Sequence, residues 1–100
     1  VDGKPIFEHV DTIKQLKRDN DYQKAAELLE RLIDATEAES NAEGWGVAPW
    51  YYEQAAIVYK KLGDPDNERA VLERFAQQRH APGTKPAKLM ERLSKIRENA

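Results

Sequence analysis

The chain has 100 residues, a length typical of one domain, and it contains no cysteine. The missing cysteines exclude disulfide scaffolds, thiol catalysis and cysteine-ligated zinc, and they fit the cytoplasm, where we expect the protein. Hydrophobic residues make up 40% and charged residues 34% of the chain, a balance typical of amphipathic helices. No apolar run approaches the roughly 18 residues that a membrane span needs, so we expect no membrane association. Because Val1 rather than Met stands first, we expect a trimmed chain or a piece of a longer one.

The net charge of −2 hides an uneven distribution of charge along the chain. Residues 1–68 carry fifteen acids and eight bases, whereas residues 69–100 carry three acids and eight bases. A basic C-terminal third is suited to an acidic partner or to nucleic acid. The other interpretation is that these bases screen the acidic part of the same molecule.

Two helices are predicted in the first half of the chain. Apolar residues spaced by four, three and three positions predict a helix over residues 5–18: Ile6, Val10, Ile13 and Leu16. Asn20 and Asp21 predict a turn, with Asp21 as the N-cap of a second helix over residues 21–39. A wide stripe marks this second helix: Tyr22, Ala25, Ala26, Leu29, Leu32, Ile33 and Thr36. A loop is predicted over residues 40–48.

A third helix is predicted over residues 49–62, with Pro49 in its first turn. Its apolar residues lie on nearly all sides, so it should be the central helix, packed on two flanks. The face that carries Tyr52 and Tyr59 is expected to lie in the core, because the two rings fill space that neighbouring alanines leave open.

Two further helices complete the prediction. Gly63 is expected to stop the third helix, and Asp64 with Pro65 to begin a fourth that ends near His80. Its apolar side is predicted from five residues: Val71, Leu72, Phe75, Ala76 and Arg79. After a break at "HAPGTKP", Thr84 is expected to cap a last helix over residues 84–98. The stripe of that helix is formed by Leu89, Leu93 and Ile96. The fold class is therefore all-α, and short loops make consecutive helices antiparallel neighbours.

Residues 13–32 and 56–75 align as two helix–turn–helix units. Each has a large apolar residue, a basic pair, a turn containing Asn20 or Gly63, and then Leu-Glu-Arg. Asn and Gly tolerate the left-handed backbone that such a turn needs. We expect Ala25 and Ala70 to let the second helix of each unit close against the first.

Within these units, "WYYEQAAIVYKKLGD" and "NDYQKAAELLERL" resemble the first helix and the turn with second helix of the tetratricopeptide repeat (TPR) family. The resemblance covers roughly residues 5–82. It implies a right-handed stack of antiparallel helix pairs, a TPR-like α-α superhelix, in a single domain over residues 1–100. Unit one is residues 5–39, the loop 40–48, unit two 49–81, and the capping helix 84–98. The spacing of 43 residues from Leu16 to Tyr59 departs from the family's usual repeat of about 34.

The resemblance also implies a non-catalytic protein-interaction module, a scaffold that binds an acidic protein or peptide in a concave, partly basic groove. It places the contact residues on the first and third helices: Phe7, Lys14, Lys17, Trp50, Glu53, Ile57, Lys60 and Lys61. Val10 and Arg18 lie on the same face. Because Val10 stands where the family has a polar group, its clamp for C-terminal carboxylates is not matched. The alternative is that these lysines are ordinary solvated side chains.

Trp45 lies between two glycines in the predicted loop. We expect it to fold back over the junction of the second and third helices. The alternative is an exposed anchor for a partner, since tryptophan is enriched at interaction hot spots.

The sequence shows no pattern of catalytic or metal-ligating residues. His9 and His80 have no spaced partner ligand, and there is no phosphate-binding glycine loop or nucleophile elbow. We therefore expect no enzymatic activity, no cofactor and no metal. Two alternatives to peptide binding stay open: nucleic-acid binding through Lys85, Lys88 and Arg92, which the acidic net charge disfavours, and self-association as a homodimer.

Overall fold

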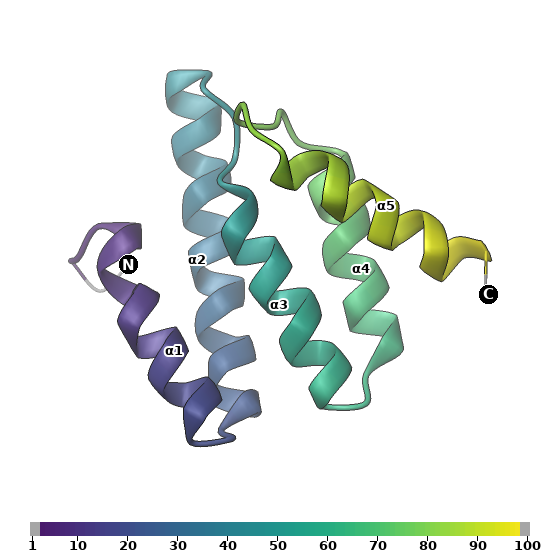
Figure 1. The fold of residues 1–100 in the computed structure, drawn as a ribbon. Coiled ribbons are helices and arrows are strands. Elements are labelled where there is room, and N and C mark those ends of the chain that lie inside the picture. Colours follow the sequence, from purple (N-terminus) through teal and green to yellow (C-terminus); the bar gives the residue numbers. More distant parts are fainter. Residues whose placement is uncertain (1–2, 99–100) are drawn as a thin grey trace.

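Five α-helices and one short 3-10 helix make up the computed structural model, which describes residues 3–98 (Figure 1). They are η1 (Ile6–His9), α1 (Val10–Arg18), α2 (Tyr22–Glu43), α3 (Pro49–Lys61), α4 (Pro65–Ala76) and α5 (Lys85–Glu98). The same residues contain no strand, only an isolated bridge between Val47 and His80. The predicted all-α class is confirmed.

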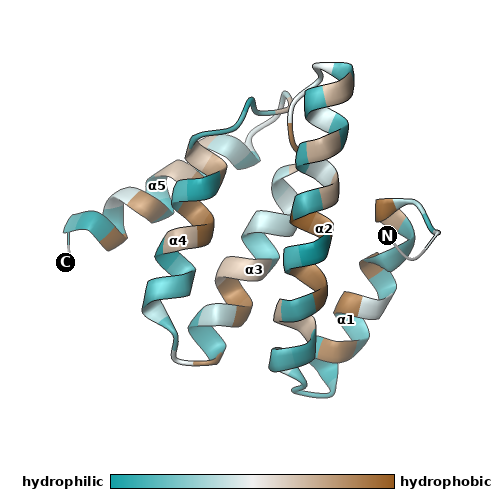
Figure 2. Cartoon of the chain, turned by 180° about the vertical axis from the view of Figure 1, so that it is seen from behind, coloured by the Kyte–Doolittle hydropathy of each residue, from teal (hydrophilic) through white to brown (hydrophobic). Residues whose placement is uncertain are grey.

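The helices lie in two layers, with α1 and α3 in front of α2 and α4 in the view of Figure 1. Helices α1 to α4 run antiparallel to their neighbours in the chain, and α5 begins beside α3 and crosses obliquely in front of α4 (Figure 1). Helix α3 packs against α2, α4 and α5. Polar and apolar residues alternate along each helix (Figure 2), as expected when one face of each helix is buried.

Helix α3 is the centre of the core, as its sequence predicts. Tyr52, Ala55 and Ala56 are fully buried, and Tyr59 is 9% exposed. Val58 is buried on the other side of the same helix. Because α2, α4 and α5 all pack against α3, a helix without a broad polar face is stable here.

The turns that end α1 and α3 share one hydrogen-bond pattern, with equivalent residues 43 positions apart. Asp21 N donates to Leu16 O at 2.9 Å, and Asp64 N donates to Tyr59 O at 3.0 Å. Asn20 and Gly63 occupy the left-handed region, with φ of 57° and 69°. This is the Schellman arrangement, in which a left-handed residue lets two amides satisfy the last carbonyls of a helix.

The α2–α3 and α4–α5 loops hold each other by backbone hydrogen bonds. Val47 N donates to Arg79 O at 2.7 Å, and Ala81 N donates to Val47 O at 3.3 Å. The His80 ring stacks on Phe75 at 4.0 Å. A Cβ on Gly46 would lie 2.5 Å from Ala81 N, so only glycine allows this close approach. We call these paired loops, residues 44–48 and 77–84, the loop clasp.

Three predicted boundaries differ from the structure. Residues 6–9 form a 3-10 helix, and Pro5 precedes it. Helix α2 continues through residue 43 and ends where Gly44 turns left-handed with φ of 77°, so the loop begins at residue 44 and not at residue 40. Helix α4 ends at residue 76 rather than near residue 80, because His80 belongs to the loop clasp.

Some predicted core positions are also wrong. Ala70, Ala76 and Arg79 are exposed, whereas Val71, Leu72 and Phe75 of the same predicted face are buried. Ala25 lies in the core as expected, but Ala70 does not close its unit. The aligned position 43 residues after Ala25 is Glu68, so the small-residue match fails while the Leu-Glu-Arg match holds.

Candidate functional site

Three of the predicted contact residues meet a residue of α5 in one pocket. Ile57, Lys60 and Lys61 of α3 line a pocket of about 520 Å3 together with Arg92. The two lysines lie on the last turn of α3, where cations also favour the negative end of the helix dipole. Among residues 3–98, no carboxylate lines this pocket.

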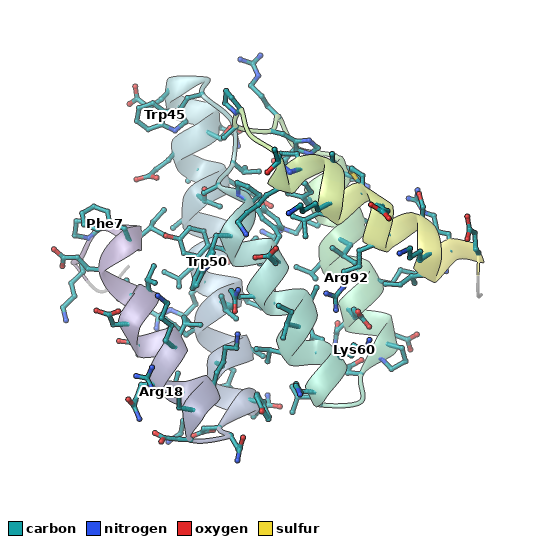
Figure 3. All side chains as sticks on the ribbon, viewed as in Figure 1. Phe7, Arg18, Trp45, Trp50, Lys60 and Arg92 are labelled. Carbon is teal, nitrogen blue, oxygen red and sulfur yellow. The ribbon has the colours of Figure 1, made fainter. Side chains whose placement is uncertain are left out.

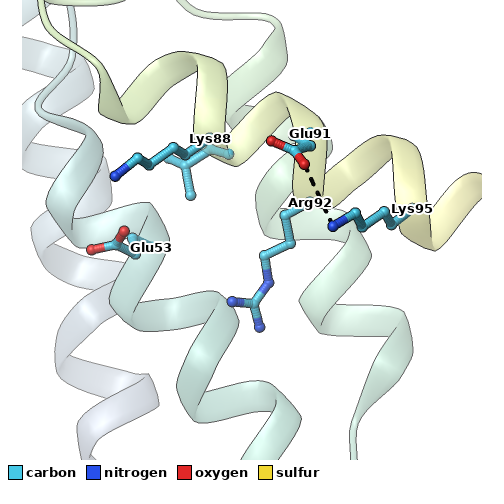
Figure 4. Close-up of a pocket in the computed structure, with 6 residues that line it drawn as sticks. Glu53, Lys88, Glu91, Arg92 and Lys95 are labelled. Carbon is cyan, nitrogen blue, oxygen red and sulfur yellow. Dashed lines mark ion pairs between the residues drawn. The ribbon is translucent and has the colours of Figure 1, made fainter.

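A second pocket, of about 330 Å3, continues along the same junction (Figure 4). It is lined by Glu53, Lys88, Leu89, Glu91, Arg92 and Lys95. Because Arg92 lines both pockets, they form one elongated feature between α3 and α5. We call its lining the α3–α5 groove: Glu53, Ile57, Lys60, Lys61, Lys88, Leu89, Glu91, Arg92 and Lys95.

Ion pairs neutralise much of the charge around the α3–α5 groove. Arg92 donates to Glu68 of α4, with its terminal nitrogen 2.8 Å from the carboxylate oxygen. Glu53 accepts from the Lys85 ammonium at 2.8 Å. Within residues 3–98, the side-chain ammonium groups of Lys60, Lys61 and Lys88 make no hydrogen bond or ion pair. The unpaired positive charge of the groove therefore lies on these lysines.

The other predicted contact residues lie apart from the α3–α5 groove. Lys14 and Lys17 line a separate depression on α1 with Arg18, and Lys17 donates to Gln54 of α3. Trp50 is partly buried, with its ring edge-on to Tyr51 at 5.3 Å. Phe7 is 69% exposed on η1, at the opposite end of the molecule from Lys60 (Figure 3). These four predicted contact residues therefore do not line the α3–α5 groove.

Sequence reasoning missed the wall that α5 contributes. The sequence predicts Leu89 as part of the apolar stripe of a capping helix and offers Lys88 and Arg92 as nucleic-acid contacts, and neither prediction places them beside the third helix. The available signal was the excess of bases after residue 68, because an α5 that packs beside α3 brings those bases to the lysines of the third helix.

A charged network lies between α2, α3 and α4. Arg74 donates to Glu37 at 2.7 and 2.9 Å, to Asp34 at 2.5 Å and to Glu30 at 3.4 Å. The Tyr52 hydroxyl donates to Glu37 at 2.7 Å. The Glu37 side chain is only 17% exposed, so this carboxylate does not lie on a solvated helix face. We call this set, with Tyr59, the Arg74 network.

The Arg74 network shifts the titration of its members. Burial, and then the hydrogen bond to Glu37, raise the pKa of Tyr52 far above its ordinary value. Burial and the hydrogen bond to Glu30 do the same to the pKa of Tyr59. The hydrogen bonds to Glu37 raise the pKa of Arg74. All three groups are therefore protonated at neutral pH, and they donate hydrogen bonds from α3 and α4 to the carboxylates of α2.

The predicted position of Trp45 is wrong. Its side chain is 61% exposed and projects from the end of α2 (Figure 3), instead of covering the junction of α2 and α3. Val47 fills that junction and is fully buried. The Thr36 hydroxyl, also buried, accepts a hydrogen bond from Ala48 N at 3.1 Å. These two residues leave the indole no place against the core.

Residues 3–98 contain no group of three or more histidine, aspartate or glutamate side chains placed to hold a metal ion. Among the same residues, no helix has the length and apolar character that crossing a bilayer requires. No protein-family model, curated protein or solved structure matched the chain.

Proposed function

We propose that this chain is a non-catalytic protein-interaction module that binds an acidic segment of a partner protein in the α3–α5 groove. The pocket shared by Ile57, Lys60, Lys61 and Arg92 carries this proposal, because it joins an apolar side chain to three cations, of which only Arg92 is paired with a carboxylate, that of Glu68. Such a lining is complementary to a chain that alternates acidic and apolar side chains.

The helix dipole alone accounts for the two lysines but not for the whole pocket. Lysines on the last turn of a helix are stabilised by about 0.3–1 kcal/mol without any ligand. Arg92 comes from a different helix, and its guanidinium is held in place by Glu68, whose side chain is 13% exposed. The convergence of α3 and α5 on one pocket is the observation that favours a binding site over a solvated helix end.

We also propose that the fold is a TPR-like stack of two units, closed by α5. The identical turns after α1 and α3 support this relation, as does the burial of equivalent residues 43 positions apart. Leu29 and Leu72 are both fully buried, and so are Leu32 and Phe75. The aligned segments of the two units therefore bury equivalent positions.

Nucleic-acid binding is the less favoured alternative, because the bases of the C-terminal third are largely engaged within the fold. Arg74 binds three carboxylates, Lys85 binds Glu53, and Arg92 binds Glu68. Further bases pair on the surface: Arg69 and Arg97 with Glu73, and Lys95 with Glu91. A base that is already paired with a carboxylate neutralises phosphates poorly, so it releases few of the counter-ions that are bound to the nucleic acid.

Titration of a fluorescein-labelled peptide of alternating glutamate and leucine tests the proposal by anisotropy. We expect binding that weakens with added salt and that is lost when lysine replaces glutamate in the peptide. Lys60→Glu combined with Lys61→Glu should weaken binding at least about tenfold, since two attractive charges become repulsive.

The matched control is Lys24→Glu, which reverses an exposed lysine on α2 whose ammonium is 3.7 Å from Asp21. It should bind the peptide like the parent protein. Equal weakening by the control would show a general charge effect and refute the site. Light scattering on the same samples measures self-association, the remaining alternative.

A further inference from the structure

One end of the α3–α5 groove differs from the rest in its charge. We call it the basic end: Ile57, Lys60, Lys61 and Arg92. Its three cations have one counter-ion, Glu68, which is bound to Arg92. Two positive charges are therefore left without a partner. The other pocket of the groove has one unpaired cation, Lys88, and two carboxylates, Glu53 and Glu91, so the larger excess of positive charge lies at the basic end.

Arg92 is oriented before any ligand arrives. Its Nε and one terminal nitrogen donate to the same oxygen of Glu68, at 3.2 and 2.8 Å. The second terminal nitrogen has no partner among the described residues. Figure 4 shows Arg92 extending from α5 toward the space beside α3. A guanidinium held in this way keeps free donors for a tetrahedral or planar anion at low entropic cost.

We propose that the basic end binds a phosphorylated serine or threonine of the partner segment, an inference that rests on the proposed peptide-binding function. A phosphate monoester carries close to two negative charges at neutral pH, which matches the unpaired charge of the basic end. A glutamate carries one. Ile57 supplies an apolar contact for the residue next to the phosphorylated one.

A phosphopeptide fits this surface better than a polynucleotide does. A nucleic-acid backbone that continued along the α3–α5 groove would meet the carboxylates of Glu53 and Glu91. None of the groove residues is aromatic, so unpaired bases would have no ring to stack on. The exposed aromatics Phe7 and Trp45 lie at the far side of the molecule (Figure 3).

Three labelled peptides that differ at one central position test the inference: serine, glutamate and phosphoserine in the same alternating glutamate and leucine sequence. We expect the phosphopeptide to bind about tenfold more tightly than the glutamate peptide at pH 7.5, because it pairs both free charges. This preference should shrink as the pH falls through about 6, where the phosphate takes up its second proton.

Variants locate the preference on the protein. Lys60→Gln with Lys61→Gln should bring the phosphopeptide and the glutamate peptide to within about threefold of each other. Both lysines are exposed and unpaired, so this variant should melt like the parent protein. Arg92→Lys keeps the charge but removes the planar fork, and it should lower the preference as well. Lys24→Gln is the control and should leave the preference unchanged.

The outcomes separate the two proposals. Equal affinity for the phosphoserine and glutamate peptides overturns the phosphate inference and leaves the proposed function in place. Failure of every peptide to bind removes both. A short single-stranded RNA that binds more tightly than the phosphopeptide, with the same loss in the Lys60 and Lys61 variant, overturns the inference in favour of nucleic acid.

Discussion

Replacing Arg74 by methionine should destabilise the protein more than the loss of any other ion pair described above. The change keeps much of the aliphatic length but removes four hydrogen bonds to three carboxylates. A fully buried charge left without its partner costs about 3–5 kcal/mol. Since the side chains of Arg74 and Glu37 are 33% and 17% exposed, we expect about 2–3 kcal/mol here.

Urea denaturation followed by circular dichroism measures this loss, and thermal melting should show a fall of roughly 10–20 °C. The control is Lys24→Met, which removes an exposed ion pair with a distance of 3.7 Å and should cost less than about 0.5 kcal/mol. Combining Arg74→Met with Glu37→Gln should recover part of the loss, giving a coupling energy of about 1–2 kcal/mol.

A cost below about 0.5 kcal/mol for Arg74→Met would refute this reasoning. The Arg74 network would then be a set of solvated surface pairs, and the attachment of α2 to α4 would depend on apolar packing alone. A double variant as unstable as the sum of the single changes would refute the direct coupling of Arg74 to Glu37.

Three further predictions concern other parts of the fold. Gly46→Ala places a Cβ 2.5 Å from the carbonyl carbon of His80, so we expect the free energy of unfolding to fall by more than about 2 kcal/mol and the amides of the loop clasp to exchange hydrogen faster. Exchange as slow as in the parent protein would contradict the close approach. The fold raises the pKa values of Tyr52 and Tyr59, so their contribution to the free energy of unfolding is complete below pH 10.0, the ordinary pKa of tyrosine, and falls as the pH rises above it. The urea midpoint, measured at increasing pH from pH 9, should drop for the parent protein and drop less when both residues are replaced by phenylalanine. Leu93→Ala empties a fully buried position and should cost about 2–4 kcal/mol in urea denaturation; a cost below about 1 kcal/mol would show that α5 is only loosely attached.

The helix starts after residue 48 were predictable because their signals are local. Pro49 and Pro65 occupy first-turn positions, and the Asp64 side chain accepts a hydrogen bond from Asn67 N at 3.2 Å. The left-handed turns at Asn20 and Gly63 likewise need only the tolerance of those two residues for positive φ. Each of these features depends on a few consecutive residues.

Helix ends were less predictable where tertiary contacts decide them. "SNAE" reads as polar loop sequence, but Ser40 is 6% exposed and α2 continues to the left-handed Gly44. Helix α4 stops early because His80 Nε2 donates a hydrogen bond to Phe75 O at 2.7 Å, and His80 pairs with Val47 from a distant loop. No window of neighbouring residues contains that second partner.

The groove shows the same division between local and distant information. Ile57, Lys60 and Lys61 could be placed on one side of a helix from their spacing alone. The opposite wall could not, because it depends on the oblique path of α5 across α4 and beside α3. That path is set by burial of Leu89 and Leu93 and by ion pairs that span 24 and 32 positions of sequence. The family resemblance pointed instead to α1.

The loop clasp has an optical consequence. The chain has two tryptophans, and their surroundings differ: Trp45 is 61% exposed, whereas Trp50 is partly covered and lies edge-on to Tyr51. The backbone on either side of Trp45 is anchored, since Gly44 O accepts from Arg79 at 2.7 Å and Val47 N is bound in the clasp. Its indole should therefore emit at long wavelength and be quenched first by iodide, yet rotate with the whole molecule rather than with a flexible loop. Time-resolved fluorescence polarisation would measure the rotational correlation time of Trp45, and so the rigidity of that end of the molecule, without any added label.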